Sequence, residues 1–139
     1  MAAPKVQIEA EVSAPAQRVW LYWTAPEHIT KWNFASTDWQ CPWAKNELRP
    51  GGIYSARMEA KDGSFGFELS GIYDEVVDQK KMTYTMEDGR KVTTEFKAIG
   101  DKTKVTTVFD AEKQNPIEMQ REGWQSILNN FKAYAEAAK

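Results

Sequence analysis

Residues 53–73 read IYSARMEAKDGSFGFELSGIY and contain the clearest hairpin pattern in the chain. Asp62-Gly63 is a dipeptide typical of a tight β-turn, and apolar and polar residues alternate on both sides of it. A turn at this dipeptide predicts an antiparallel hairpin whose apolar partners all fall on one face. The predicted pairs on that face are Tyr54 with Gly71, Ala56 with Leu69, Met58 with Phe67, and Ala60 with Phe65.

Two further hairpins follow along the chain. A turn at Gly100-Asp101 again brings apolar residues together on one face. A two-residue turn near Gly89 would set Tyr84 opposite a threonine, so we predict a three-residue loop, Glu87–Gly89, with Gly89 left-handed. That loop places Tyr84 opposite Val92. We therefore expect an antiparallel meander of about six strands over residues 44–110.

The segment before this meander begins with a strand and continues with two short helices. Residues 5–12 alternate strictly between polar and apolar side chains, which is typical of a strand with one solvated face. Pro15 and the spacing of the following apolar residues predict a helix over 15–23. A capping pattern around Pro26 predicts a second short helix that ends near Trp32.

The C-terminal segment has helical periodicity. Asn115 and Pro116 are start signals, and Glu118 supplies an acidic residue in the first turn. The helix is expected to run to about residue 137. Its apolar stripe consists of Ile117, Gln120, Trp124, Ile127, Leu128, Phe131, Tyr134 and Ala135.

This order of elements resembles the START-like or SRPBCC superfamily, whose helix-grip fold is shared with the birch-pollen allergen. The chain is similar over nearly its whole length to bacterial homologues of the heat-shock-protein-90 ATPase activator. The residues that carry this resemblance are Ala14-Pro15, Val19-Trp20, Pro26 to Trp32, Asp38-Trp39, Leu48-Arg49-Pro50-Gly51-Gly52, Gly71-Ile72-Tyr73, Gly123-Trp124, Leu128, Phe131 and Tyr134.

The resemblance implies one α+β domain over residues 1–139. We expect a curved antiparallel sheet of about seven strands, with two short helices after the first strand and the long C-terminal helix on its concave face. The eukaryotic co-chaperone of the activator family has a separate N-terminal domain that binds the chaperone. We expect a chain of 139 residues to lack that domain, so the resemblance by itself does not carry that function across.

Composition excludes several classes of function. Lys plus Arg number 18 and Asp plus Glu number 20, so no large positive field is available to bind nucleic acid. The single Cys41 cannot form an internal disulfide, and we find no membrane-spanning pattern, so we expect a cytoplasmic protein without membrane insertion. With only His28 and Cys41 as nitrogen and sulfur ligands, we predict no metal site and no cofactor.

Large rings contribute much of the apolar surface, because the chain contains six Trp, five Tyr and six Phe. Between a strongly curved sheet and one helix, such side chains often leave a space that they fill only in part. We predict that this space is a ligand cavity. Its expected lining residues are Trp20, Trp23, Tyr54, Met58, Phe67, Leu69, Tyr84, Met86, Phe96, Gln120, Trp124 and Leu128.

Three functions are compatible with this arrangement. The favoured one is binding of a small hydrophobic or amphipathic molecule in the cavity, with Gln120 and two tyrosines as polar contacts. The alternative is a protein-interaction module, similar to a chaperone partner, that uses the aromatic loop over residues 33–45. A cyclase- or hydrolase-type enzyme is less favoured, because the predicted lining contains no acid or base and we predict no catalytic residue.

Overall fold

The computed structural model describes residues 4–137, and the ends of the predicted 1–139 domain, residues 1–3 and 138–139, lie outside the described residues. Strands and helices follow one another in the expected order. In the described part of the chain the elements are β1 (Lys5–Val12), α1 (Ala16–Thr24), α2 (Pro26–Ile29), β2 (Trp39–Gln40), β3 (Ala44–Asn46), β4 (Ile53–Ala60), β5 (Gly66–Val77), β6 (Lys81–Met86), β7 (Lys91–Ile99), β8 (Lys102–Asp110) and α3 (Ile117–Ala137).

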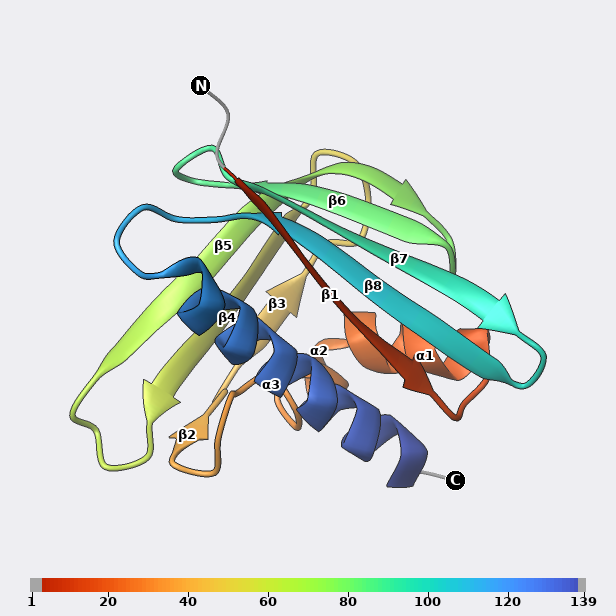
Figure 1. Cartoon of the computed structure of the whole chain (residues 1–139), viewed down its shortest axis with the longest axis horizontal. Coiled ribbons are helices and arrows are strands. Elements are labelled where there is room, and N and C mark those ends of the chain that lie inside the picture. The colour runs from red at the N-terminus through yellow and green to blue at the C-terminus, as the bar shows by residue number, and fades with distance from the viewer. Residues whose placement is uncertain (1–3, 138–139) are drawn as a thin grey trace.

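All the strands belong to one antiparallel sheet (Figure 1). Its order is β1-β8-β7-β6-β5-β4-β2, and the three-residue strand β3 also pairs with β4. The first strand therefore closes onto the last one, β8, through the register Lys5 to Asp110 and Val12 to Thr103. The predicted sheet, with two short helices after the first strand and a long helix at the end, is confirmed.

The three predicted hairpin registers are all present. Met58 lies opposite Phe67 in β4 and β5, and the β7–β8 hairpin shows the predicted alignment throughout. In the β6–β7 hairpin, Tyr84 lies opposite Val92, and Gly89 has a φ of 91°. The backbone N–H of Gly89 donates to the carbonyl of Met86 at 2.9 Å, which closes the predicted three-residue loop.

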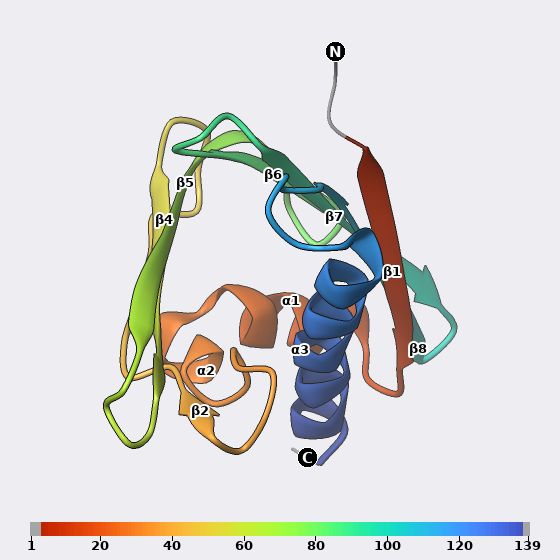
Figure 2. The ribbon, with the colours of Figure 1, turned by 60° about the vertical axis from the view of Figure 1, so that its left-hand side comes forward.

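The sheet is strongly curved, as Figure 2 shows, and the helices lie on its concave side. The register between β5 and β6 shifts between Tyr73 and Glu75, which marks a β-bulge in the longest strand. A bulge bends its strand and increases the local twist, so it helps β4 and β5 turn toward the helices. The curvature brings one end of the sheet round to face α3.

The helices differ from expectation only at their ends. α1 and α3 begin and end within two residues of the predicted bounds. α2 ends at Ile29, three residues before the predicted end at Trp32, and turns complete that segment. No helix within residues 4–137 is long and apolar enough to cross a membrane.

The buried apolar side chains form two clusters. The larger one joins α1, α2 and the C-terminal half of α3 to the sheet, with Phe131 and Val105 fully buried. The smaller one lies near the start of α3 and includes Val6, Phe109 and Met86. Burial of such side chains is the main source of stability in a domain of this size.

Helix α3 is also tied to the edge strand β1 by side-chain hydrogen bonds to the backbone. The Gln125 amide donates to the carbonyl of Glu9 at 3.1 Å, and the Lys132 ammonium donates to the carbonyl of Glu11 at 2.7 Å. The backbone N–H of Ser13 donates to the Glu136 carboxylate at 2.8 Å. These contacts hold the helix along β1, away from β4 and β5.

Candidate binding cavity

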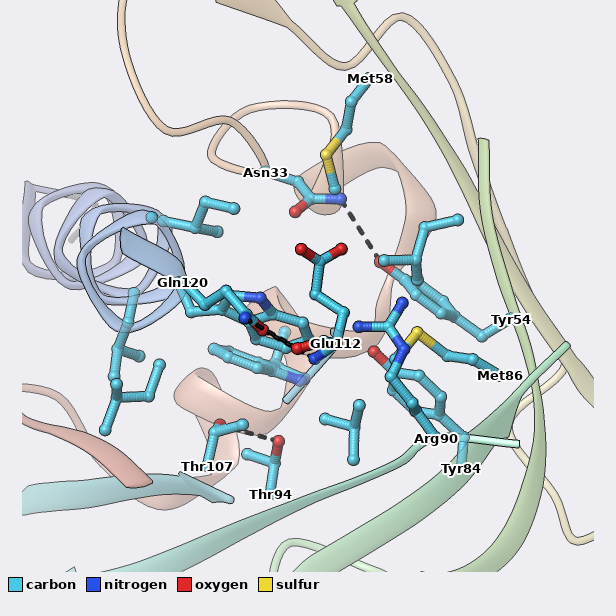
Figure 3. A pocket seen from close by; sticks show the side chains of 18 of the residues that line it. Asn33, Tyr54, Met58, Tyr84, Met86, Arg90, Thr94, Thr107, Glu112 and Gln120 are labelled. Carbon is cyan, nitrogen blue, oxygen red and sulfur yellow. Dashed lines mark hydrogen bonds between the residues drawn. The ribbon is translucent and has the colours of Figure 1, made fainter. Parts of the chain in front are cut away.

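A cavity of about 370 Å³ lies between α3 and the concave face of the sheet. Strands β4 to β8 supply one side of its lining, and the N-terminal half of α3 supplies the other (Figure 3). Because α3 is held against β1, its first turns stand away from β4 and β5. The cavity is the space that this placement leaves.

Ten of the twelve predicted residues line this cavity. They come from α1, three successive strands and α3, so the predicted registers bring together residues far apart in the sequence. These ten residues are Trp23, Tyr54, Met58, Phe67, Leu69, Tyr84, Met86, Gln120, Trp124 and Leu128.

Trp20 and Phe96, the other two predicted residues, do not line the cavity. Their rings make an edge-to-face contact with a centroid distance of 5.2 Å, and both belong to the larger buried cluster. Phe96 has the inward orientation expected from its register, but it lies further along β7, where α1 covers the sheet. One turn after Trp20, Trp23 reaches the cavity instead.

Two tyrosines stand next to each other in the cavity wall. The ring centroids of Tyr54 and Tyr84 are 5.5 Å apart. The Tyr54 hydroxyl accepts a hydrogen bond from the Asn33 amide at 3.3 Å. Burial raises the pKa of both phenols. Charge repulsion from Tyr84 raises the pKa of Tyr54 further, and charge repulsion from Tyr73 raises the pKa of Tyr84 further. Both hydroxyls are therefore protonated at neutral pH.

The ring of Tyr84 depends on a glycine in the neighbouring strand. A Cβ atom on Gly71, the residue opposite Met86 in β5, would lie 2.5 Å from Cδ2 of Tyr84. Any larger residue at this position would push the ring aside. The absence of a side chain at Gly71 thus fixes where the Tyr84 ring rests.

Gln120 lines the cavity but has a structural role that the sequence did not reveal. Its Oε1 accepts from the backbone N–H of Glu112 at 2.9 Å, and its Nε2 donates to the carbonyls of Glu112 and Asn115. The amide thus holds the segment between β8 and α3, and only the second lone pair of Oε1 stays available. The predicted contact of Gln120 with a ligand stays a prediction.

The sequence analysis missed several polar lining residues, among them Asn33, Arg90 and Glu112. Arg90 lies two residues before the inward-facing Val92, so the alternation of β7 already placed it on the concave face. Glu112 lies in a loop without periodicity, and no sequence signal indicated its position. Its carboxylate accepts a hydrogen bond from the Asn115 amide.

Three other kinds of reactive group, the threonine hydroxyls, the Cys41 thiol and possible metal ligands, add no site to the cavity of the described residues. The hydroxyls of Thr94 and Thr107 bond to each other at 2.9 Å in the cavity wall. Cys41 is buried and does not line the cavity, and burial raises the pKa of its thiol. Residues 4–137 bring together no cluster of three or more His, Cys, Asp or Glu side chains that would hold a metal ion.

One rim of the cavity carries exposed rings. Phe65 is 60% exposed and Phe67 is 41% exposed, and Trp39 from the predicted aromatic loop packs against both. We call these three residues the aromatic rim. Phe67 belongs both to this surface and to the cavity lining.

Comparisons with known proteins agree with the fold. The family model described as Activator of Hsp90 ATPase homolog 1-like protein matches residues 13–136. The solution structure of the AHSA1-like protein from Aeromonas hydrophila is 39% identical, with a TM-score of 0.91 over 97% of this chain and 94% of that one. The solution structure of Chr148 from Cytophaga hutchinsonii is 46% identical, with a TM-score of 0.83 over 96% and 92% of the two chains.

More distant structures share the fold alone. The crystal structure of CV1439 from Chromobacterium violaceum is 22% identical and superimposes with a TM-score of 0.86, covering 96% of this chain and 98% of that one. No curated protein matches this chain. Since the family model covers most of the sequence, the chain belongs to the Activator of Hsp90 ATPase homolog 1-like family.

Proposed function

We propose that this protein binds a small apolar or amphipathic molecule in the cavity between α3 and the sheet. The cavity volume of about 370 Å³ lies within the range of about 300–1,000 Å³ that is usual for small-molecule sites. Large rings and methionines line most of it, and a few polar groups reach into it. Methionine side chains adapt to ligands of different shape, which suits such a site.

The observation that carries this proposal is the open space beside Gly123. This glycine lies in α3 and lines the cavity, and a Cβ atom built on it meets no heavy atom within 4 Å. Protein interiors are normally packed as densely as organic crystals. A helix that presents a bare backbone to a space of this size is typical of a site that accommodates another molecule.

A neutral fluorescent probe, N-phenyl-1-naphthylamine, tests the proposal. We expect its emission to rise on binding with a stoichiometry of one, and we expect it to raise the melting temperature because it binds the native state selectively. Gly123→Leu places a side chain in the cavity and should abolish binding. Glu122→Leu adds the same side chain at the neighbouring exposed position of α3 and serves as the matched control.

Two results would contradict the proposal. One is a wild-type protein that does not bind the probe, and the other is equal binding by the Gly123→Leu and Glu122→Leu variants. In the second case the probe would be attached to the outer surface. A filled interior would then leave the aromatic rim as the remaining candidate surface for function.

The aromatic rim favours a second candidate function, the binding of a protein partner. Exposed rings that cluster together are enriched at protein interfaces, and here Trp39, Phe65 and Phe67 contribute to one surface. The family description makes an Hsp90 chaperone the first partner to test. Calorimetry should show binding that Phe65→Ser removes while the naphthylamine probe still binds. The absence of heat with wild-type protein at two well-separated temperatures would exclude this partner.

A further inference from the structure

The hydroxyl of Tyr84 is a hydrogen-bond donor without an acceptor. It lines the cavity, and within residues 4–137 it bonds to no side chain or backbone group, whereas the Tyr73 hydroxyl donates to Asn46 at 2.7 Å. No side-chain nitrogen or oxygen of the described residues is both buried and unpaired, so this hydroxyl is open to the space of the cavity. A ligand that displaces water from it must offer a hydrogen-bond partner to avoid a free-energy cost. Because burial raises the pKa of Tyr84, the phenol keeps its proton and has it available to donate.

Arg90 adds a charged donor to the same wall. Its Nε donates to Asp88 at 2.7 Å, but its two terminal nitrogens bond to nothing within residues 4–137. The register places Arg90 diagonally across from Tyr84, because Tyr84 pairs with Val92 two residues further along β7. Figure 3 shows the guanidinium and the phenol both extending from this wall into the cavity.

A third donor completes the group. The Tyr54 hydroxyl accepts a hydrogen bond from Asn33, which leaves its own proton without an acceptor in the described residues. Tyr54, Tyr84 and Arg90 thus present three free donor groups on one side of the cavity. Such a set is complementary to an oxygen group that accepts several hydrogen bonds, and a guanidinium favours one with negative charge.

We propose that the ligand of this cavity has a carboxylate end, which lies between the terminal nitrogens of Arg90 and the hydroxyl of Tyr84. Its apolar body then rests on Met86, Leu69 and Trp124, which line the cavity beyond these donors. This assignment rests on the proposed function, since it names the chemical class of the bound molecule.

Glu112 is the one carboxylate among the described residues that line the cavity, and it affects the expected affinity. It forms no ion pair with Arg90 and bonds instead to Asn115 on the rim. Its negative charge works against a second carboxylate in the cavity, so Glu112→Gln should strengthen the binding of an acid. The same substitution should weaken the binding of an amine.

Three probes that share one ring and differ in their head group test the proposal by calorimetry at pH 7. They are 2-naphthoate, 2-naphthylmethanol and 2-naphthylmethylamine. We expect wild-type protein to bind the acid at least about tenfold more tightly than the alcohol, which corresponds to about 1.4 kcal/mol. The amine should be the weakest of the three.

Variants assign this preference to particular residues. Arg90→Gln and Tyr84→Phe should each reduce the ratio of acid affinity to alcohol affinity, with Arg90→Gln reducing it to about one. Using the ratio separates the loss of a head-group contact from a general disturbance of the cavity, which lowers both affinities. Lys113→Gln removes an exposed positive charge beside the rim and is the control that should keep the ratio.

Each other outcome overturns a defined part of the reasoning. Equal binding of acid and alcohol, or a preference for the amine, would refute the carboxylate and leave the apolar binding function intact. An acid preference that survives in both Arg90→Gln and Tyr84→Phe would refute the assigned site. Failure of all three probes and of N-phenyl-1-naphthylamine would refute the proposed function itself. If Arg90→Gln does not fold, Tyr84→Phe and Glu112→Gln still decide the question.

Discussion

Replacing Gly123 by alanine is expected to stabilise the protein, although the substitution lies in the wall of the proposed binding cavity. Glycine inside a helix costs about 1 kcal/mol relative to alanine, because the unfolded backbone loses more freedom. The added Cβ has no steric cost here, since no heavy atom lies within 4 Å of its position. The free energy of unfolding should therefore rise by about 1 kcal/mol.

Urea unfolding measured by tryptophan fluorescence tests this magnitude. For a chain of 139 residues the same change should raise the melting temperature by about 4 °C. Glu122→Ala is the matched control, because Glu122 is exposed, has helical neighbours on both sides and already has a good helix propensity. It should change stability by less than about 0.5 kcal/mol.

A loss of stability in Gly123→Ala would refute the reasoning, because it would mean that α3 packs closely against another element at this point. The cavity would then be smaller than the structure shows. A gain that is accompanied by weaker binding of N-phenyl-1-naphthylamine would instead locate the probe beside Gly123.

Three further predictions concern buried polar groups. The Cys41 thiol should react slowly with a thiol reagent in the folded protein and rapidly in urea, because burial shields it and raises its pKa; equal rates would contradict this. Above pH 10 stability should fall as pH rises, because Tyr84 keeps its proton in the folded state while the unfolded chain, with an ordinary pKa near 10.0, loses it. Denaturant titrations from pH 10 to 11 should show that Tyr84→Phe reduces the loss of stability over this interval by about 1 kcal/mol. Gln120→Leu should lower the free energy of unfolding by about 2 kcal/mol, since it leaves Glu112 and Asn115 backbone groups unpaired; an unchanged urea midpoint would show that water replaces the amide.

The arrangement of the sheet could be predicted from the sequence because each hairpin offers its own test of register. A shift of one residue moves a whole strand's apolar side chains to the wrong face. The requirement that Tyr84 meet Val92 was enough to predict the three-residue loop at Gly89. Ten of the residues that line the cavity followed from the same alternation in the strands, together with the helical period of α3.

Two features of the cavity could not be predicted from alternation. One is how far along a strand a residue lies from the helix that covers it, and the other is the path of the loops. Alternation shows that Phe96 faces inward, but not that α1 covers that end of β7. The hydrogen bonds of Gln120 go to a loop whose path has no periodic signal. Arg90 could have been found by continuing the alternation of β7 backwards by one step, whereas Glu112 required the three-dimensional structure.

The hydrogen bonds from α3 to β1 have a consequence for self-association. An edge strand normally exposes a row of free carbonyls and amides, onto which a strand from another molecule can add. Here side chains of the helix occupy the carbonyls of Glu9 and Glu11 and the amide of Ser13. A second copy of the chain would have to displace these side chains before it could extend the sheet at β1, so the terminal helix protects this edge against aggregation as well as forming one wall of the cavity.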